Sequence, residues 1–220
     1  MSTETKFIYR ITYTKGDSVK YISHLDFLRC VNRSFKRAKI PVKYSQGFNP
    51  HILLNIGLPC PVGVSSECEL LDIELKWETD TEKIREDLNR AMPEGIQILS
   101  VERRTTHPDF YEIEFARYEI TFNSDKDFDT ESFAKEDSFI IEKKSKRGMK
   151  EVNIKDFVKE MSISKTEDGK YRLVCIISAG NKLNLKPDLL LSAIASYHGA
   201  IFKDVQTVRQ KIFFENQPLQ

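Results

Sequence analysis

The sequence predicts an α+β protein made of two tandem units with antiparallel sheets. Two observations lead to this prediction. Segments with strand and helix periodicity alternate as β-α-β-β-α-β over the first half of the 220 residues, and a weaker version of this order follows in the second half. This order is typical of the split βαβ unit of the ferredoxin-like fold. We therefore expect two ferredoxin-like (βαββαβ) units, the second of them degraded.

The first half contains four expected strands and two expected helices. Residues 7–13, FIYRITY, alternate apolar and polar side chains as a half-buried strand does. Ser23 is suited to cap a helix, with Asp26 three residues later at the positive helix end, and apolar residues follow at helical spacing as far as Ala38. The other expected elements are a strand at 42–44 and 52–58 interrupted by a loop, strands at 69–77 and 96–102, and a helix at 81–92.

The second half repeats this order less clearly. Residues 171–178, YRLVCIIS, form its most apolar expected strand, and Pro187 stands where prolines begin helices. The other expected elements are strands at 118–122, 139–143, 150–154 and 201–208 and helices at 129–134, 154–161 and 187–197. The expected domains are a first unit at 1–104, a connector at 105–116, a second unit at 117–214 and a tail at 215–220. One continuous domain is the alternative.

The composition limits the possible classes of function. The 34 basic and 33 acidic side chains give a net charge of +1, so a nucleic-acid surface would have to be a local patch. The sequence shows no signal peptide and no run near the roughly 18 apolar residues that a spanning helix needs, so we expect no membrane partner. The cysteines match no zinc spacing, which favours reduced thiols in a cytoplasmic protein and no metal site: Cys30, Cys60, Cys68 and Cys175.

A stripe of basic residues lies on the expected helix after Ser23. Its members recur at i, i+4, i+7 and i+8: Arg29, Arg33, Lys36 and Arg37. Such a stripe occupies largely one face of a helix and can bind phosphates, because arginine forks hold phosphate oxygens and such contacts supply sequence-independent affinity. A basic outer face that serves only solubility is the alternative interpretation.

The segment SQGFNPH at residues 45–51 follows the same helix. It offers an aromatic ring for base stacking and polar groups that read base edges, so we expect contacts to a base or small ligand from Gln46, Phe48, Asn49 and His51. Glycine permits unusual backbone angles and proline restricts the residue before it. We therefore expect the site to be shaped by Ser23, Asp26, Ser45, Gly47 and Pro50. A basic tip at 143–150 adds a second expected contact through Lys146 and Arg147.

His24 and His51 are the candidates for acid–base catalysis, because histidine titrates near neutral pH. Supporting the helix cap and packing under the loop are the structural alternatives. An acidic run could bind a metal only if another ligand converged on it: Glu67, Glu69, Asp72 and Glu74. Ser23, Ser45 and Cys60 lack a recognisable base in a known arrangement, so no complete catalytic motif is present.

Three runs carry a family resemblance: SHLDFLR, RSFKRAKIPVKYSQGFNPH and GLPCPVGVSSECELLDIEL. They resemble the radical-SAM-linked protein family of unknown function, whose members occur alone or as the C-terminal portion of radical S-adenosylmethionine proteins. The pattern is specific over residues 6–75, and the second half is compatible with it. The resemblance implies a radical SAM partner protein. Because this chain lacks CxxxCxxC, the iron–sulfur cluster and S-adenosylmethionine would be carried by that partner, with no cofactor here.

A looser architectural similarity to CRISPR-repeat endoribonucleases, which also pair two ferredoxin-like units, suggests RNA as the ligand by fold-level analogy. The glycine-rich C-terminal loop of those enzymes has no clear counterpart here, which argues against cleavage. Our hypothesis is an RNA-binding accessory module that presents structured RNA to a radical-SAM RNA-modifying enzyme in a separate chain. The alternatives are an RNA- or nucleotide-processing enzyme that uses His24 and His51, and a protein-interaction adaptor.

Overall fold

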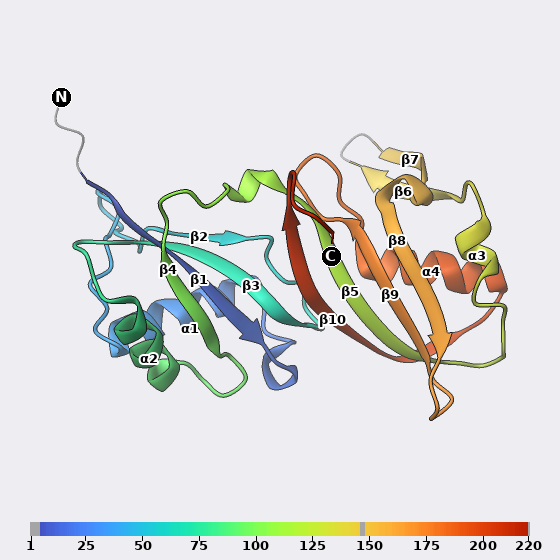
Figure 1. The fold of residues 1–220 in the computed structure, drawn as a ribbon, viewed down its shortest axis with the longest axis horizontal. Helices are drawn as coiled ribbons and strands as arrows, with labels where there is room; N and C mark the ends of the chain where they lie inside the picture. Colours follow the sequence, from blue (N-terminus) through green and yellow to red (C-terminus); the bar gives the residue numbers. More distant parts are fainter. Residues whose placement is uncertain (1–4, 146–147, 220) are drawn as a thin grey trace. The chain divides into compact units, whose positions relative to one another are not determined.

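The computed structural model describes residues 5–145 and 148–219 and is a mixed α+β structure with mainly antiparallel strands (Figure 1). The α+β class is therefore confirmed. The chain divides into two compact units between Phe110 and Tyr111, which lies inside the expected connector at 105–116. No helix within the described ranges is both long and apolar enough to cross a membrane.

Unit 1 contains a four-stranded antiparallel sheet and two α-helices. The strands are β1 (Phe7–Lys15), β2 (Leu54–Gly57), β3 (Val64–Leu75) and β4 (Ile98–Arg103), and the helices are α1 (His24–Arg37) and α2 (Thr81–Ala91), with a short 3₁₀ helix η1 (Asp17–Val19) after β1. The strand order is β4-β1-β3-β2, and all three pairings are antiparallel. The elements follow one another along the chain as β-α-β-β-α-β, the order that the sequence predicts.

The core of unit 1 lies between the sheet and the two helices. Tyr9, Ile11 and Tyr13 alternate along β1 with polar residues, so they share one face of the sheet. The same hydrophobic cluster contains inward residues of β3, α1 and α2: Leu71, Ile73, Leu75, Phe27, Val31, Phe35, Ile84 and Leu88. Helices α1 and α2 therefore both cover this face, and the other face of α1 is left to solvent.

The strand expected at residues 42–44 and 52–58 is mostly irregular. Val42 and Tyr44 form only isolated bridges, to Leu75 and Ile52, and the regular strand β2 is confined to Leu54–Gly57. Proline lacks a backbone N–H, so the prolines at 41 and 50 cannot donate to a continuous ladder. Strand β3 begins at Val64 rather than at residue 69, because buried serines extend it, and it ends two residues before the exposed Trp77.

Unit 2 contains a second four-stranded antiparallel sheet and a separate two-stranded hairpin. The sheet strands are β5 (Ile113–Ser124), β8 (Val158–Lys165), β9 (Tyr171–Ser178) and β10 (Phe202–Phe214), in the order β10-β5-β9-β8. The hairpin pairs β6 (Ile140–Ser145) with β7 (Gly148–Asn153). The helices are α3 (Ser132–Lys135) and α4 (Pro187–His198), with η3 (Ile154–Phe157) before β8. A further 3₁₀ turn, η2, runs from Phe110 to Glu112.

The prediction of a helix at residues 154–161 is wrong. The chain there makes one 3₁₀ turn, η3, and then enters strand β8. Asn153 accepts a hydrogen bond from the backbone N–H of Lys155 and so stabilises the short turn. Ile163 of β8 pairs with Leu173 of β9, so tertiary pairing decides the structure of a segment whose short pattern suits either state.

Two boundaries in unit 2 also differ from the prediction. Strand β5 begins at Ile113, inside the expected connector, and β10 continues to Phe214 rather than ending at residue 208. Arg209 in this extension is only 1% exposed, and its Nε donates a hydrogen bond to the hydroxyl of Tyr118 at 3.2 Å. A charged residue buried in a strand hides the apolar alternation on which the prediction of that boundary depends.

Candidate nucleic-acid interface

Helix α1 begins with a capping group made of three of the predicted site residues. The hydroxyl of Ser23 accepts a hydrogen bond from the backbone N–H of Asp26 at 3.2 Å and donates one to its carboxylate at 2.8 Å. Arg29 donates to the other carboxylate oxygen at 2.9 Å. The hydrogen bonds from Ser23 and then Arg29 hold the pKa of Asp26 below its ordinary value. The charge of Arg29 is therefore partly offset within the helix.

The basic stripe of α1 separates into engaged and available side chains. Arg37 donates to the backbone carbonyl of Ala91 at 2.6 Å and to the hydroxyl of Ser34 at 3.0 Å, so it joins the C-terminal ends of α1 and α2. The side chains of Arg33 and Lys36 are exposed and make no ion pair or hydrogen bond with any residue that the structure describes. Of the four side chains predicted to contact phosphates, Arg33 and Lys36 can therefore bind an anion without first breaking an interaction.

The segment at residues 45–51 is a closed loop. At its neck the backbone N–H of Ser45 donates to the carbonyl of His51 at 2.8 Å, directly beside the bridge between Tyr44 and Ile52. The backbone N–H of His51 donates to the hydroxyl oxygen of Ser45 at 3.1 Å, and that oxygen lies 2.8 Å from Nδ1 of the imidazole. Hydrogen bonds between Ser45 and His51 therefore close the neck of the loop.

The tip of this loop presents an aromatic ring to solvent. Gly47 has φ +127°, a backbone conformation that other residues rarely adopt, and Phe48 follows it with its side chain fully exposed (106%). Burial of a phenylalanine side chain contributes about 1.5–3 kcal/mol, and Phe48 contributes none of this to the fold. The neighbouring polar side chains are also exposed: Gln46, Asn49 and His51.

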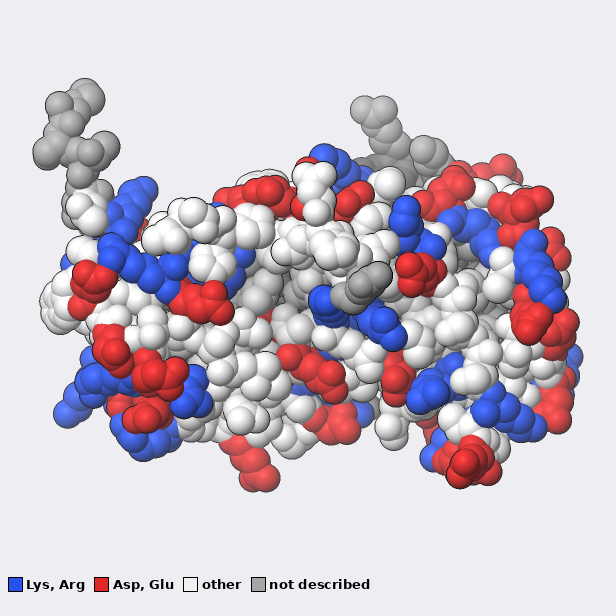
Figure 2. Space-filling view, in the orientation of Figure 1, with Lys and Arg blue, Asp and Glu red and all other residues white. Residues whose placement is uncertain are grey.

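The charges of the chain form no field of a single sign. On the face shown in Figure 2, Lys and Arg are interspersed with Asp and Glu, consistent with 34 basic and 33 acidic residues in the sequence. Long-range attraction of a polyanion therefore does not arise from net charge. The predicted contacts Lys146 and Arg147 lie outside the residues that the structure describes.

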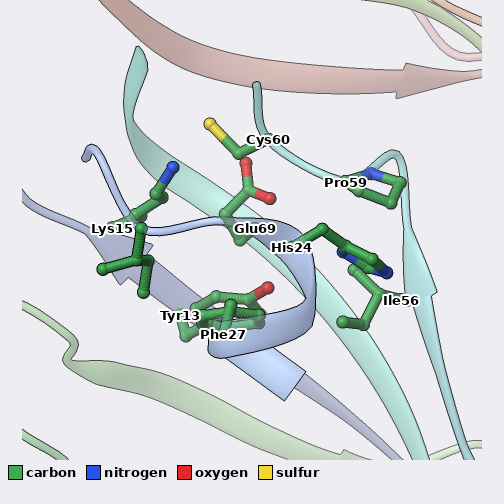
Figure 3. Close-up of a pocket in the computed structure, with 9 residues that line it drawn as sticks. Tyr13, Lys15, His24, Phe27, Ile56, Pro59, Cys60 and Glu69 are labelled. Carbon is green, nitrogen blue, oxygen red and sulfur yellow. The ribbon is translucent and has the colours of Figure 1, made fainter. Parts of the chain in front are cut away.

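A small cavity lies beside the first turn of α1 (Figure 3). It contains two nearly inaccessible charged residues, Lys15 (4% exposed) and Glu69 (0%). The ammonium group of Lys15 donates to the carbonyls of Lys20 and Pro61 at 2.9 and 3.1 Å. The cavity volume of about 20 Å³ has room for about one water molecule. The buried lysine therefore holds together the segments that contain Lys20 and Pro61.

The two histidines do not share this cavity. His24 lines it together with Cys60, whose thiol donates to the carbonyl of Val64 at 3.3 Å. His51 is not among the lining residues, and its Nδ1 is held by Ser45. His51 is therefore not part of the cavity that His24 lines.

Sequence reasoning missed Lys15 and treated Glu69 only as part of an acidic run. Lys15 has the same strand parity as Tyr9, Ile11 and Tyr13, and Glu69 has the parity of the inward residues of β3. This alternation is the signal that could have identified both as buried. Without the tertiary structure, the two charged residues instead suggest the end of a strand and a solvated face.

Asp72 and Glu74 of the acidic run are engaged by basic side chains. Asp72 forms a buried bidentate pair with Arg10, at 2.8 and 2.9 Å, and a contact with Arg104 at 3.2 Å. The guanidinium group of Arg10 also lies 4.3 Å from the ring centre of Phe110. Glu74 pairs with Lys43 at 2.9 Å. Within the described residues, no group of three or more His, Cys, Asp and Glu side chains is placed to hold a metal ion.

The fold and the site define a mixed α+β protein with an exposed cationic helix and an exposed aromatic loop in its first unit. The chain belongs to the family described as "Uncharacterized protein conserved in bacteria (DUF2344)", whose model matches residues 8–187. A search of curated proteins found no match. The matched span includes α1 and the loop at 45–51, while most of α4 and all of β10 follow it. The family description gives no reaction or ligand.

Proposed function

We propose that the protein is an RNA-binding accessory module whose first unit presents structured RNA to a radical-SAM RNA-modifying enzyme in a separate chain. The observation that carries the RNA part is the pair of exposed cations on α1, Arg33 and Lys36, which no described residue engages. Exposed lysine and arginine side chains that can release counterions from phosphates supply sequence-independent affinity for RNA. The exposed ring of Phe48 adds a surface on which a base can stack.

The same proposal includes the finer fold assignment. The strand orders β4-β1-β3-β2 and β10-β5-β9-β8 support two ferredoxin-like units, because each sheet places its strands in the order fourth, first, third, second. In unit 2 the first crossover helix is replaced by α3, the β6–β7 hairpin and η3, which supports the description of that unit as degraded.

The radical-SAM part of the proposal is supported by the sequence resemblance over residues 6–75. The iron–sulfur cluster and S-adenosylmethionine would be held by the partner, in the cytoplasm, and the chain described here would supply RNA binding. A partner also needs a surface on which to dock. Three exposed apolar side chains support such a role: Tyr21 and Leu25 at the start of α1, and Val62, whose neighbour Gly63 donates a backbone hydrogen bond to Lys20.

The RNA proposal is tested by the salt dependence of binding, measured by fluorescence anisotropy with a labelled stem–loop RNA. In the double variant Arg33→Ala/Lys36→Ala we expect at least a tenfold loss of affinity at low salt. The slope of log K against log[salt] is negative, and we expect its magnitude to decrease by about 1.4. Each phosphate contact to a single strand contributes about 0.7 to that magnitude.

The matched control is Lys83→Ala/Arg85→Ala, which removes two basic side chains of α2 that are paired with Asp87 and Glu82. We expect RNA affinity and salt slope to remain near those of the wild type. Equal losses in both double variants would show that only total charge matters, and an unchanged affinity in the α1 variant would overturn the proposal. Absence of RNA binding by the wild type at low salt would also overturn it.

A further inference from the structure

We infer that the loop at residues 45–51 binds an unpaired nucleotide, with the ring of Phe48 stacked on the base and the imidazole of His51 donating a hydrogen bond from Nε2. This inference rests on the proposed RNA-binding function and specifies its substrate as RNA with an unpaired base. It assigns stacking and hydrogen bonding to the loop and phosphate binding to α1.

The loop is a preorganised platform rather than a loosely held segment. Three hydrogen bonds between Ser45 and His51 close its neck, and the bridge between Tyr44 and Ile52 continues the pairing below it. A neck fixed in this way limits the conformations that the loop must give up when it binds, and preorganisation of this kind raises affinity. The residues between 45 and 51 form the tip of the loop, which is the part that contacts the ligand.

The exposure of Phe48 selects an unpaired base. A phenylalanine ring stacks on the flat face of any base, but in a duplex both faces of each internal base are covered by its neighbours. Only a base in a loop, a bulge or a single strand can leave its stack and cover the ring. Because Gly47 turns the chain with φ +127° and Phe48 is fully exposed, the ring is accessible without rearrangement of the core.

The hydrogen-bond network at the neck accommodates the tautomer of His51 that is protonated on Nε2, and our inference takes this tautomer. The oxygen of Ser45 accepts the backbone N–H of His51, so the hydroxyl hydrogen of Ser45 can be donated to Nδ1 at 2.8 Å. A neutral imidazole whose Nδ1 accepts a hydrogen bond carries its proton on Nε2. His51 is exposed, so in this tautomer its Nε2–H is available to acceptor atoms on a base edge. Ser45 acts as a positioning residue for this donor.

The chain also places phosphate contacts near the loop in sequence. Residues 38–44 join the end of α1 to the neck, and Arg33 and Lys36 lie in the last two turns of that helix. A nucleotide on the loop continues in a phosphate backbone, which needs cationic partners. The division of labour predicts that the two regions respond differently when the RNA is changed.

The test combines a change in the RNA with a change in the protein. Two RNAs are compared, a stem–loop with 2-aminopurine in the loop and the same stem–loop with an abasic site at that position. For the wild type we expect quenching of the 2-aminopurine fluorescence on binding, and a loss of affinity of about 5- to 150-fold for the abasic RNA, the range found when base–aromatic stacking is removed. Phe48→Leu should bind the 2-aminopurine RNA more weakly than the wild type does, by a factor similar to that of the abasic substitution. It should bind the abasic RNA nearly as well as the wild type does, because removing the ring and removing the base eliminate the same contact.

Two controls make the result specific. Tyr111→Leu removes another exposed aromatic ring (76% exposed), from unit 2, and should bind both RNAs like the wild type. His51→Ala should weaken binding of the 2-aminopurine RNA more than that of the abasic RNA. If RNA binds but Phe48→Leu has no effect, or the losses from ring and base simply add, this inference is overturned while the proposed function stands. If the wild type binds no RNA, both fail.

Discussion

The two units place their strands in the same order but cross from the first strand to the second in different ways. In unit 1 the crossover between β1 and β2 contains the 14-residue helix α1. In unit 2 the crossover between β5 and β8 contains the four-residue helix α3, the β6–β7 hairpin and η3. The strand pattern is therefore kept where the crossover is not. The two units thus share the arrangement of their sheets and differ in the crossover segment, which is where a functional surface can differ between them.

Both crossovers also contribute to a core. Helix α1 buries Phe27, Val31 and Phe35, and the shorter α3 buries Phe133, which lies edge-on to Phe139 at 5.3 Å and to Tyr197 at 5.4 Å. What distinguishes α1 is its outer face, which is long, regular and cationic. A rigid helix holds side chains at fixed spacing, which is what a repeating phosphate backbone requires.

The largest expected effect comes from removing the buried ring of each crossover. Phe35→Ala and Phe133→Ala both remove fully buried side chains, and such changes cost about 3–5 kcal/mol. We expect Phe35→Ala to lie at the upper end, because Phe35 is fully buried in the large hydrophobic cluster of unit 1. Urea denaturation measures both, with the exposed Phe48→Leu as a variant of unchanged stability. A larger cost for Phe133→Ala would contradict the view that α1 is the better-packed crossover.

A smaller effect distinguishes two neighbouring arginines of the same stripe. Arg37→Ala should lower the free energy of unfolding by about 0.5–1.5 kcal/mol, since it removes hydrogen bonds to Ala91 and Ser34, and should leave RNA affinity nearly unchanged. Arg33→Ala should weaken RNA binding and leave the free energy of unfolding nearly unchanged. Thermal unfolding and RNA titration of the two variants side by side check this. Loss of RNA affinity in Arg37→Ala with no loss of stability would show that its contact to α2 gives way to the ligand.

The smallest effect concerns acid sensitivity in unit 2. Burial, with a smaller contribution from Lys126 and against an opposing one from Asp129, lowers the pKa of His198. As the pH falls below 6.5, His198 therefore takes up a proton more readily in the unfolded chain than in the folded chain. Its contribution to the free energy of unfolding is present above pH 6.5 and is lost as the pH falls through the pKa of the folded state. We expect His198→Phe, which keeps a ring against Phe128, to reduce the fall in stability below pH 6.5. Denaturation curves at a series of pH values measure it, and an unchanged slope in the variant would refute the assignment.

The sequence predicts much of unit 1 because its strands and helices alternate at clear periods and each has its own boundary residue. Ser23 before α1 and the turn glycine at 47 act locally, so their roles could be predicted without a fold. The contact of Arg37 with Ala91 could not, because it joins residues 54 apart in the chain. Buried charges such as Lys15 and Arg209 mislead for the same reason, since their partners are known only in the folded structure.

The most direct test of the account is to map where RNA touches the protein. A stem–loop RNA with 4-thiouridine in its loop is crosslinked by ultraviolet light to the wild-type protein, and the crosslinked peptides are identified by mass spectrometry. We predict crosslinks within residues 45–51 and on the exposed face of α1, and their loss at the loop in Phe48→Leu. Crosslinks confined to residues 111–219, with none in unit 1, would contradict the claim that the first crossover and its loop form the RNA-binding surface.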